Sequence, residues 1–129
     1  MGQKSKSILI VDDSETNLVL LEAVLKDRNW DIHRARSAMV AMKMLSVNKP
    51  DLILLDLLMP GIDGQKMLKR MKSDDRYKNI PVIVVSAVTD KKIRKDCLEM
   101  GAIYYMPKPV KIKQLLEIIQ NTLDDCSND

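Results

Sequence analysis

Short apolar runs alternate with helical patterns along the chain, and the alternation repeats five times. The runs are rich in valine, isoleucine and leucine and are bounded by polar or turn residues, which is typical of β-strands. Between them, apolar residues recur at the spacing of an amphipathic helix. Strands are therefore expected at 7–11, 30–35, 51–56, 82–86 and 104–106, and helices at 14–27, 37–47, 64–72, 91–100 and 111–123.

The pattern within each strand predicts where it lies in a sheet. Residues 52–55 and 82–85 are continuously apolar, which predicts strands buried on both faces, whereas residues 30–35 alternate and predict a more exposed strand. Five consecutive β–α units favour an α/β, doubly wound fold with five helices on two faces. We expect a five-stranded parallel sheet in the flavodoxin-like order 2-1-3-4-5. Pro107 supports an edge position for the fifth strand, because proline lacks the N–H that a central strand needs.

Each helix is expected to bury one stripe of side chains. The fourth helix carries Ile93, Cys97 and Leu98 on one side, and Gly101 is well placed to end it. The fifth helix carries a longer stripe, formed by Ile112, Leu115, Leu116, Ile119 and Leu123. We expect one domain over residues 7–123, between a flexible N-terminus at 1–6 and a flexible C-terminal tail at 124–129.

Composition is that of one soluble domain, since 46% of the 129 residues are hydrophobic and 30% are charged. No apolar run approaches the roughly 18 residues of a membrane span, so no membrane contact is expected. Cys97 and Cys126 have neither metal-binding nor redox spacing, which fits a reducing cytoplasm. Basic residues crowd the second half, but no recognition helix or interleaved aromatics accompany them. We interpret that surface as facing a protein partner, with no nucleic acid contacted by this chain.

Polar residues follow four of the expected strands. Asp12 and Asp13 follow the first, Asp56 follows the third, Ser86 ends the fourth, and Lys108 lies beyond the fifth. The topology brings these strand ends to the crevice where open α/β sheets bind ligands. Three carboxylates in one crevice repel one another, so a cation must hold them, and oxygen-only donors indicate Mg²⁺ (or Mn²⁺). Asp56 taken alone could merely begin a turn.

The same groups limit the chemistry. No histidine, cysteine or serine triad can be assembled, because the single histidine, His33, lies in the second expected strand, where we interpret it as structural or surface. A carboxylate beside a metal, a hydroxyl and a lysine suits phosphoryl transfer to Asp56, in which catalysis is mostly positioning and charge neutralisation.

Taken in order, the motifs resemble the receiver domain of two-component response regulators. The resemblance covers about residues 7–123 and rests on Asp12-Asp13, Asp56 with Met59-Pro60-Gly61 and Asp63-Gly64, Ser86-Ala87, Gly101-Ala102 with Tyr105, and Lys108-Pro109. It implies a regulatory phosphoprotein rather than an enzyme, one that assists its own phosphorylation and dephosphorylation. The phosphoryl donor for Asp56 would be a phosphohistidine on a sensor histidine kinase or a histidine phosphotransfer protein.

The resemblance also implies which residues bind the metal. Asp13 would bind it directly, Asp12 would do so mostly through water, and Asp56 and the backbone carbonyl of Leu58 would complete the protein ligands.

Further residues would contact the phosphoryl group or respond to it. Ser86 would hydrogen-bond one phosphoryl oxygen, Lys108 would pair with another, and the small Ala87 leaves room for the group. Tyr105 would turn inward when Ser86 moves, and the Lys108–Pro109 peptide bond would be cis, as in the family. The switched surface would comprise the fourth helix, fifth strand and fifth helix, and a homodimer could form through it.

Other interpretations stay open for several of these residues. Tyr105 could simply pack, Ser86 could be an ordinary strand-end serine, and Asp63 and Gly64 are better explained as shaping a loop and starting a helix. The chain departs from the family pattern with a serine at 86 in place of the commoner threonine, with Tyr104 and with Pro107. An aspartate-nucleophile phosphatase would need a second aspartate at position 58, where leucine stands. A pseudo-receiver that only binds protein is a third possibility, and the chain is either a stand-alone receiver or part of a larger regulator.

Two features bear on switching and its lifetime. Lys91 and Lys92 lie in the first turn of the fourth helix, where cations oppose the helix dipole, so its start is expected to be loosely held. Leu58 and Val88 are expected to flank the path of a hydrolytic water, and neither can orient it. A long-lived phosphorylated state is therefore expected; the alternative is that both side chains merely point to solvent.

Overall fold

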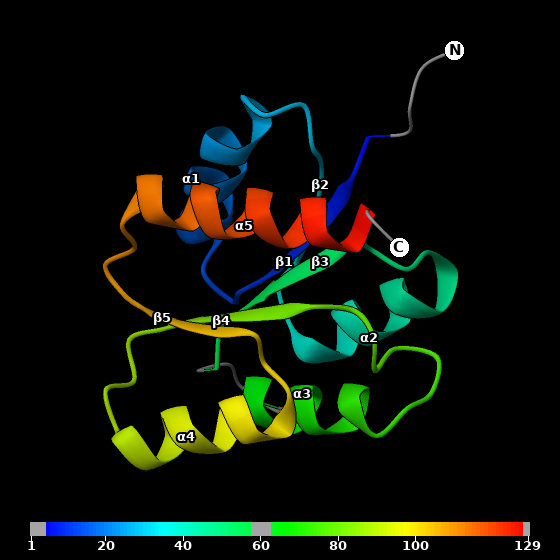
Figure 1. Ribbon diagram of the computed structural model, residues 1–129, viewed down its shortest axis with the longest axis vertical. Coiled ribbons are helices and arrows are strands. Elements are labelled where there is room, and N and C mark those ends of the chain that lie inside the picture. Colours follow the sequence, from blue (N-terminus) through cyan, green and yellow to red (C-terminus); the bar gives the residue numbers. More distant parts are fainter. Residues whose placement is uncertain (1–4, 58–62, 128–129) are drawn as a thin grey trace.

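A computed structural model of the chain describes residues 5–57 and 63–127, so the expectations for Leu58 and for Met59-Pro60-Gly61 lie outside the described residues. Figure 1 shows a parallel sheet with helices on both sides. Its strands are β1 (Ser7–Val11), β2 (Asp31–Ala35), β3 (Leu52–Leu55), β4 (Val82–Ser86) and β5 (Tyr104–Pro107). Its helices are α1 (Glu15–Lys26), α2 (Ala38–Val47), α3 (Gly64–Lys72), α4 (Lys91–Met100) and α5 (Ile112–Ser127).

The strand order is β2-β1-β3-β4-β5, and every neighbouring pair is parallel. This confirms the predicted topology, including the edge position of β5. The register aligns the carboxyl ends: Val11 lies opposite Leu55 in β3, and Ser86 lies opposite Pro107 in β5. Side chains that follow these strands therefore meet at one end of the sheet.

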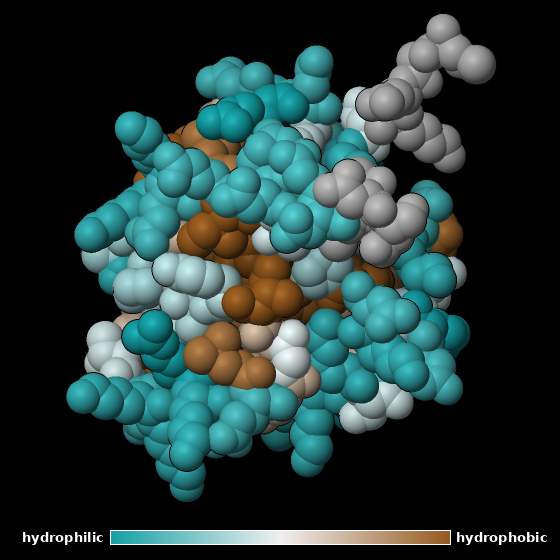
Figure 2. All heavy atoms as spheres, viewed as in Figure 1, coloured by the Kyte–Doolittle hydropathy of each residue, from teal (hydrophilic) through white to brown (hydrophobic). Residues whose placement is uncertain are grey.

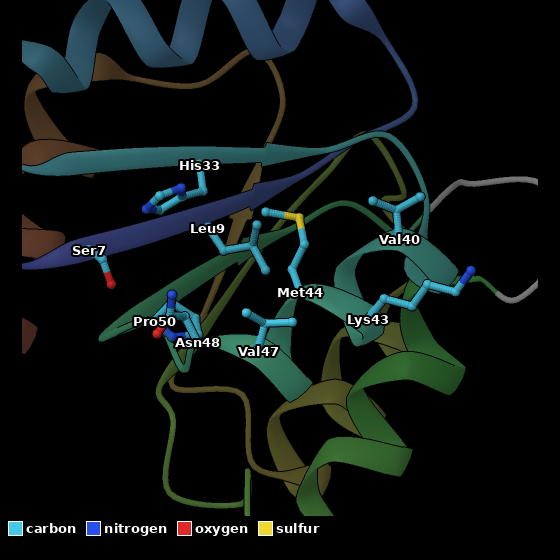
Figure 3. Close-up of a pocket in the computed structure, with 9 residues that line it drawn as sticks. All are labelled: Ser7, Leu9, His33, Val40, Lys43, Met44, Val47, Asn48 and Pro50. Carbon is cyan, nitrogen blue, oxygen red and sulfur yellow. The ribbon is translucent and has the colours of Figure 1, made fainter.

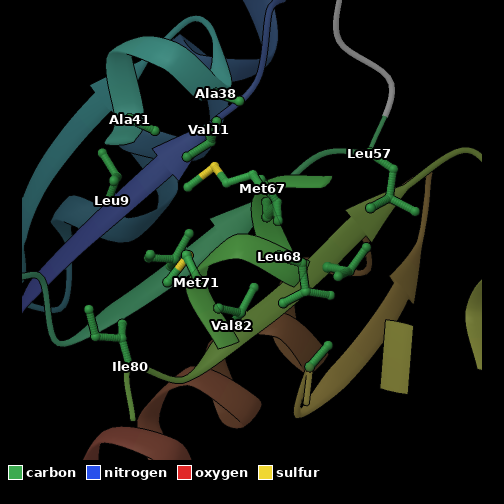
Figure 4. Close-up of a cluster of buried hydrophobic side chains, with 14 of the residues drawn as sticks. Leu9, Val11, Ala38, Ala41, Leu57, Met67, Leu68, Met71, Ile80 and Val82 are labelled. Carbon is green, nitrogen blue, oxygen red and sulfur yellow. The ribbon is translucent and has the colours of Figure 1, made fainter. Parts of the chain in front are cut away.

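The core has two layers because alternate residues of each strand point to opposite faces. One layer includes Leu9, Val11, Ile53 and Leu55 of the sheet with buried residues of α2, α3 and α4, part of which is seen in Figure 4. The other includes neighbouring strand residues such as Ile10 with buried residues of α1 and α5. Figure 1 accordingly shows α1 and α5 on one side of the sheet and the other three helices opposite.

The four helices α1 to α4 each begin at a side chain that caps a backbone N–H. Ser14, Ser37, Asp63 and Asp90 are the N-cap residues, and each side-chain oxygen accepts a hydrogen bond from an N–H of the first turn. Gly101 ends α4 with a left-handed φ of 118°, as its sequence position predicted. Asp90 was not predicted, and its carboxylate offsets the two lysines that follow it at the positive end of the helix dipole.

Three details of the helices differ from the predictions. Leu98 and Ile112 were placed on buried stripes, but both are 41% exposed. Leu98 lies one position past buried Cys97, which turns it about 100° away from the core, and the buried stripe of α5 begins only at Leu115. Helix α5 also continues past Leu123 to residue 127, because a helix can extend beyond its last apolar contact as long as its backbone hydrogen bonds form. No helix among the described residues is long and apolar enough to cross a membrane.

Candidate functional site

The carboxyl end of the sheet gathers the predicted site residues, because the strand pairing continues just past the strands. The backbone N–H of Asp56 donates to the Val11 carbonyl at 2.9 Å, and the N–H of Lys108 donates to the Ser86 carbonyl at 3.0 Å. These bonds fix the backbone from which each functional side chain extends. Residues separated by up to 96 positions in the sequence thus share one site.

Three carboxylates form the acidic part of the site. Asp12 and Asp56 are buried, at 2% and 6% exposed, and Asp13 lies at the exposed mouth. One oxygen from each of the three lies within 4.8 Å of the others. Opposite ligands of an octahedral Mg²⁺ are roughly 4.2 Å apart, so a small inward movement brings these oxygens to ligand distance. An all-oxygen set with a solvent-facing side fits Mg²⁺, which keeps several waters, or Mn²⁺.

Lys108 supplies the positive charge opposite this cluster. Its ammonium nitrogen lies 3.2 Å from Oδ2 of Asp12 and 3.6 Å from Oδ2 of Asp56. The Lys108 side chain is only 23% exposed, so solvent screens these contacts less than it screens surface ion pairs. The lysine can therefore bridge the two buried carboxylates, and any anion bound between them would find a cation in place. The Lys108–Pro109 peptide bond is cis, as the family resemblance implied.

Asp12 is held by more partners than the sequence suggested. Its Oδ1 accepts a hydrogen bond from the N–H of Ser14 at 2.9 Å, the geometry of an Asx turn. Its Oδ2 accepts from the side-chain amide of Asn17 at 3.3 Å. Asn17 is not among the predicted site residues, although its place in the first turn of α1, just after the aspartate pair, is the signal that points to it.

A chain of hydrogen bonds leads from the site to β5. Ser86 is fully buried, and its hydroxyl oxygen accepts from the N–H of Val88 at 3.1 Å. The carbonyl of Val88 accepts from the Tyr105 hydroxyl at 2.7 Å. Ser86 and Tyr105 are therefore connected through the backbone of Val88, a link that no sequence pattern indicates. The hydroxyl hydrogen of Ser86 remains to donate to a further acceptor.

The Tyr105 ring already lies inside the protein. It is 4% exposed and belongs to the core layer beneath α2, α3 and α4, whereas the resemblance implied that it turns inward only when Ser86 moves. Burial raises the pKa of Tyr105, although the nearby Ser86 hydroxyl acts in the opposite direction. The phenol therefore stays protonated at neutral pH and donates to Val88.

Gly64 is required because α3 begins against the backbone of Asp56 and Leu57. A β-carbon at Gly64 would overlap the backbone carbonyl oxygen of Asp56 and lie 2.8 Å from the α-carbon of Leu57. The N–H of Gly64 also donates to the Leu57 carbonyl at 3.2 Å. Asp63, the N-cap of α3, accepts from the N–H of Lys66 at 2.9 Å. These contacts confirm that both residues start the helix.

The remaining predicted residues lie at the margin. Ala87 is exposed and Val88 is half-buried, so Val88 does not merely point to solvent. His33 is exposed on β2, where its Nε2 lies 3.1 Å from a carboxylate oxygen of Asp31. This confirms the interpretation of the histidine as a surface residue.

Comparison with known proteins gives one consistent answer. The family model of the response regulator receiver domain matches residues 8–120. The polar-differentiation response regulator DivK of Brucella anthropi is 32% identical over 120 residues, which are 93% of this chain and 98% of DivK. The response regulator PleD of Caulobacter vibrioides is 38% identical over 106 residues, which are 82% of this chain but only 23% of PleD.

Solved structures agree with the sequence relatives. A receiver domain of a signal transduction histidine kinase from Syntrophus aciditrophicus superposes with a TM-score of 0.87 at 31% identity, covering 94% of this chain and 92% of that one. A CheY-like receiver domain protein from Methanospirillum hungatei gives a TM-score of 0.90 at 26% identity, covering 97% and 98%. Domains of this fold thus occur in proteins of quite different overall organisation.

Proposed function

Because the chain belongs to the response regulator receiver domains, we propose that Asp56 accepts a phosphoryl group in a Mg²⁺-dependent step. The donor is a phosphohistidine on a sensor histidine kinase or a histidine phosphotransfer protein in the cytoplasm. The observation that carries the proposal is the setting of Asp56: a buried carboxylate at the carboxyl end of the sheet, with two further carboxylates and the Lys108 ammonium around it. The chain acts as a regulatory phosphoprotein, and the donor protein supplies the phosphoryl group.

The transfer balances as a substitution at phosphorus. A carboxylate oxygen of Asp56 forms the new O–P bond, and the P–N bond of the phosphohistidine breaks, its electron pair going to the ring nitrogen. The donor ring carries a proton on its other nitrogen, so it leaves as neutral imidazole. An acyl phosphate remains on Asp56, and a water later attacks its phosphorus to regenerate the carboxylate and release inorganic phosphate.

Each neighbour of Asp56 has a part in neutralising or placing charge. Asp12, Asp13 and Asp56 would hold Mg²⁺, with the Leu58 carbonyl as a further expected ligand, and the bound ion supplies charge neutralisation for the phosphoryl oxygens. Lys108 lies within 3.6 Å of Asp56 and pairs with a phosphoryl oxygen once the group is attached. Asn17 and the Ser14 N–H keep Asp12 oriented through hydrogen bonds of 3.3 and 2.9 Å.

Ser86 and Tyr105 carry the change away from the site. The Ser86 hydroxyl donates to a phosphoryl oxygen. Val88 moves together with Ser86 because the Val88 N–H donates a hydrogen bond to the Ser86 hydroxyl oxygen at 3.1 Å. That movement shifts the carbonyl that Tyr105 bonds at 2.7 Å. Tyr105 is inside before phosphorylation in this arrangement, so the switch alters the loop that precedes α4 rather than swinging the ring from outside to inside.

The output surface is the one formed by α4, β5 and α5. Leu98 and Ile112 are each 41% exposed there, and Ile103 is 45% exposed. Figure 2 shows apolar atoms over the strands between α4 and α5, with hydrophilic residues above and below. A surface of this kind suits a protein partner or a second copy of the chain, and a phosphorylation-dependent homodimer could form through it.

Mass spectrometry after incubation with acetyl phosphate tests the acceptor and the metal together. We expect a single phosphoryl adduct that maps to Asp56, requires Mg²⁺ or Mn²⁺, and is lost on adding EDTA beforehand. Asp56→Asn should abolish it. Asp63→Asn is the matched control, because it removes an equal charge nearby while asparagine still caps α3. Labelling that persists in Asp56→Asn, or that EDTA does not reduce, would refute the assignment of Asp56 as a metal-dependent acceptor.

A further inference from the structure

The outward face of α2 is unusually apolar for a helix at the surface. Of its ten residues, only Lys43 and Ser46 are polar. Met39, Val40 and Val47 are 59%, 45% and 79% exposed, although the solvent face of such a helix normally carries charged or polar side chains. These apolar side chains neither contribute to the acidic site nor belong to the proposed output surface.

A pocket opens beside this face, between α2 and the edge strand β2 (Figure 3). It has a volume of about 370 Å³ and is lined mainly by apolar side chains of α2 and by Leu9 of β1. In Figure 3, Leu9 and Met44 point toward each other across it. Leu9 lies opposite His33 in the neighbouring strand. The exposed His33 ring, with its Nε2 3.1 Å from a carboxylate oxygen of Asp31, also lines the pocket. The volume is large enough to admit an apolar side chain of a partner.

The charges around the apolar face are positive. The ammonium group of Lys43, a residue that lines the pocket, forms no hydrogen bond or ion pair with the described residues. A second groove on the other side of α2 is lined by Lys66, Lys69 and Arg70 of α3, and these three side chains likewise have no ion-pair partner among residues 5–57 and 63–127. The nearby carboxylates of Asp74 and Asp75 are already engaged, by Arg76 at 2.8 Å and Lys78 at 3.0 Å. Lys43 and these three cations of α3 are therefore available to pair with carboxylates of a partner.

We propose that α2 and the pocket beside it form a docking site for an acidic amphipathic helix of a partner protein. One apolar side chain of that helix enters the pocket, others cover Val40 and Val47, and its carboxylates face Lys43 and the cations of α3. This is the helix-in-groove mode of recognition. A nucleic acid would bury the valines against phosphates, and a flat bilayer cannot enter a concave pocket, so a protein side chain fits the surface better than either.

The pocket of the docking site extends to the end of the sheet opposite the acidic cluster. Ser7 and Pro50, which line the pocket, stand at the amino-terminal ends of β1 and β3, whereas the carboxylates follow the carboxyl ends of the same strands. A partner held on α2 would therefore leave Asp56 open to its phosphoryl donor. The receiver could in this way stay attached to one protein while exchanging phosphate with another.

An NMR titration of the ¹⁵N-labelled protein tests the site with defined probes. The main probe is a 16-residue helical peptide with leucines at i, i+4 and i+7 and glutamates on its flanks. The comparison probes are the same peptide with lysine in place of glutamate, anionic phosphatidylglycerol vesicles, and a duplex DNA. We expect saturable shifts in α2 and β2 with the acidic peptide alone, weakening as salt is raised. Val47→Ser should reduce its affinity at least about tenfold, and Lys43→Glu roughly threefold.

Leu20→Ser on α1 is the matched control, because Leu20 is 60% exposed and loses the same kind of apolar contact on another face. It should leave the affinity unchanged, and melting curves of all three variants check that each remains folded. The proposal would be overturned if the shifts failed to saturate or fell outside α2 and β2. It would also be overturned if Val47→Ser and Leu20→Ser weakened binding equally. Equal or tighter binding of the basic peptide, the vesicles or the DNA would do the same.

Discussion

Replacing Tyr105 by phenylalanine isolates the hydrogen bond that joins β5 to the loop after β4. The substitution removes one oxygen and keeps the ring, which is 4% exposed and packed in the core, so no cavity forms. What is lost is the 2.7 Å bond from the hydroxyl to the Val88 carbonyl. A net intramolecular hydrogen bond contributes about 0.5–1.5 kcal/mol. Val88 is only half-buried, so water can partly replace the lost donor, and we expect a cost of about 1 kcal/mol.

The pKa of Tyr105 determines how the stability difference between wild type and Tyr105→Phe changes with pH. Burial raises the pKa of Tyr105 above the ordinary value of 10.0, so the unfolded chain loses this proton before the folded protein does. The stabilising contribution of the tyrosine is therefore fully present below about pH 10 and is lost as pH rises through the folded-state pKa. The stability difference between wild type and Tyr105→Phe should stay constant from pH 7 to about pH 10 and shrink above it.

Urea unfolding followed by circular dichroism measures both quantities. Tyr105→Phe should lower the free energy of unfolding by about 1 kcal/mol with an unchanged m-value. The matched control is Tyr104→Phe. The Tyr104 hydroxyl accepts an exposed hydrogen bond from the side-chain amide of Gln114 at 3.1 Å, so its removal should lower the free energy of unfolding by less than about 0.5 kcal/mol. The reasoning is refuted if Tyr105→Phe is as stable as wild type, or if the difference between them grows above pH 10.

Three further outcomes follow from the site. Gly64→Ala should lower the free energy of unfolding by about 1–3 kcal/mol and slow phosphorylation by acetyl phosphate, because the new β-carbon displaces the Asp56 backbone; unchanged stability would contradict the close approach. Combined Leu58→Asn and Val88→Glu should speed loss of phosphate roughly tenfold or more, because polar groups can orient the water, and an unchanged decay rate would show that these side chains do not set the lifetime. Lys108→Met should slow phosphorylation roughly tenfold or more, through loss of a preorganised cation, and a rate equal to that of wild type would remove the lysine from the mechanism.

The fold could be predicted because its pattern is local and repeated. The apolar run at 52–55 is typical of a strand covered on both faces, and five consecutive β–α units favour one common sheet order. Once that order is known, the meeting of Asp12, Asp56 and Lys108 follows from the parallel strands alone. The oxygen-only donor set of the proposed metal site also follows from the sequence.

What the sequence could not supply depends on backbone groups and side-chain orientations. Nearly every residue has a backbone carbonyl and N–H. The sequence pattern therefore does not reveal that those of Val88 lie between Ser86 and Tyr105. The inward position of Tyr105 is a choice of side-chain conformation that packing decides. Leu98 was misplaced because an apolar residue one step from a buried cysteine looks like part of the same stripe, although it faces solvent.

Amide hydrogen exchange with and without beryllofluoride, a phosphoryl mimic, tests most directly whether a change at Asp56 reaches the output surface. We expect exchange to change across residues 87–106, with a smaller response in Ser86→Ala, because that variant lacks the hydroxyl that begins the hydrogen-bond chain. Asp56→Asn should show no response to the mimic. Changes confined to the loops that carry Asp12, Asp56 and Lys108 would contradict the account, since the bound beryllofluoride would then affect only its own binding site.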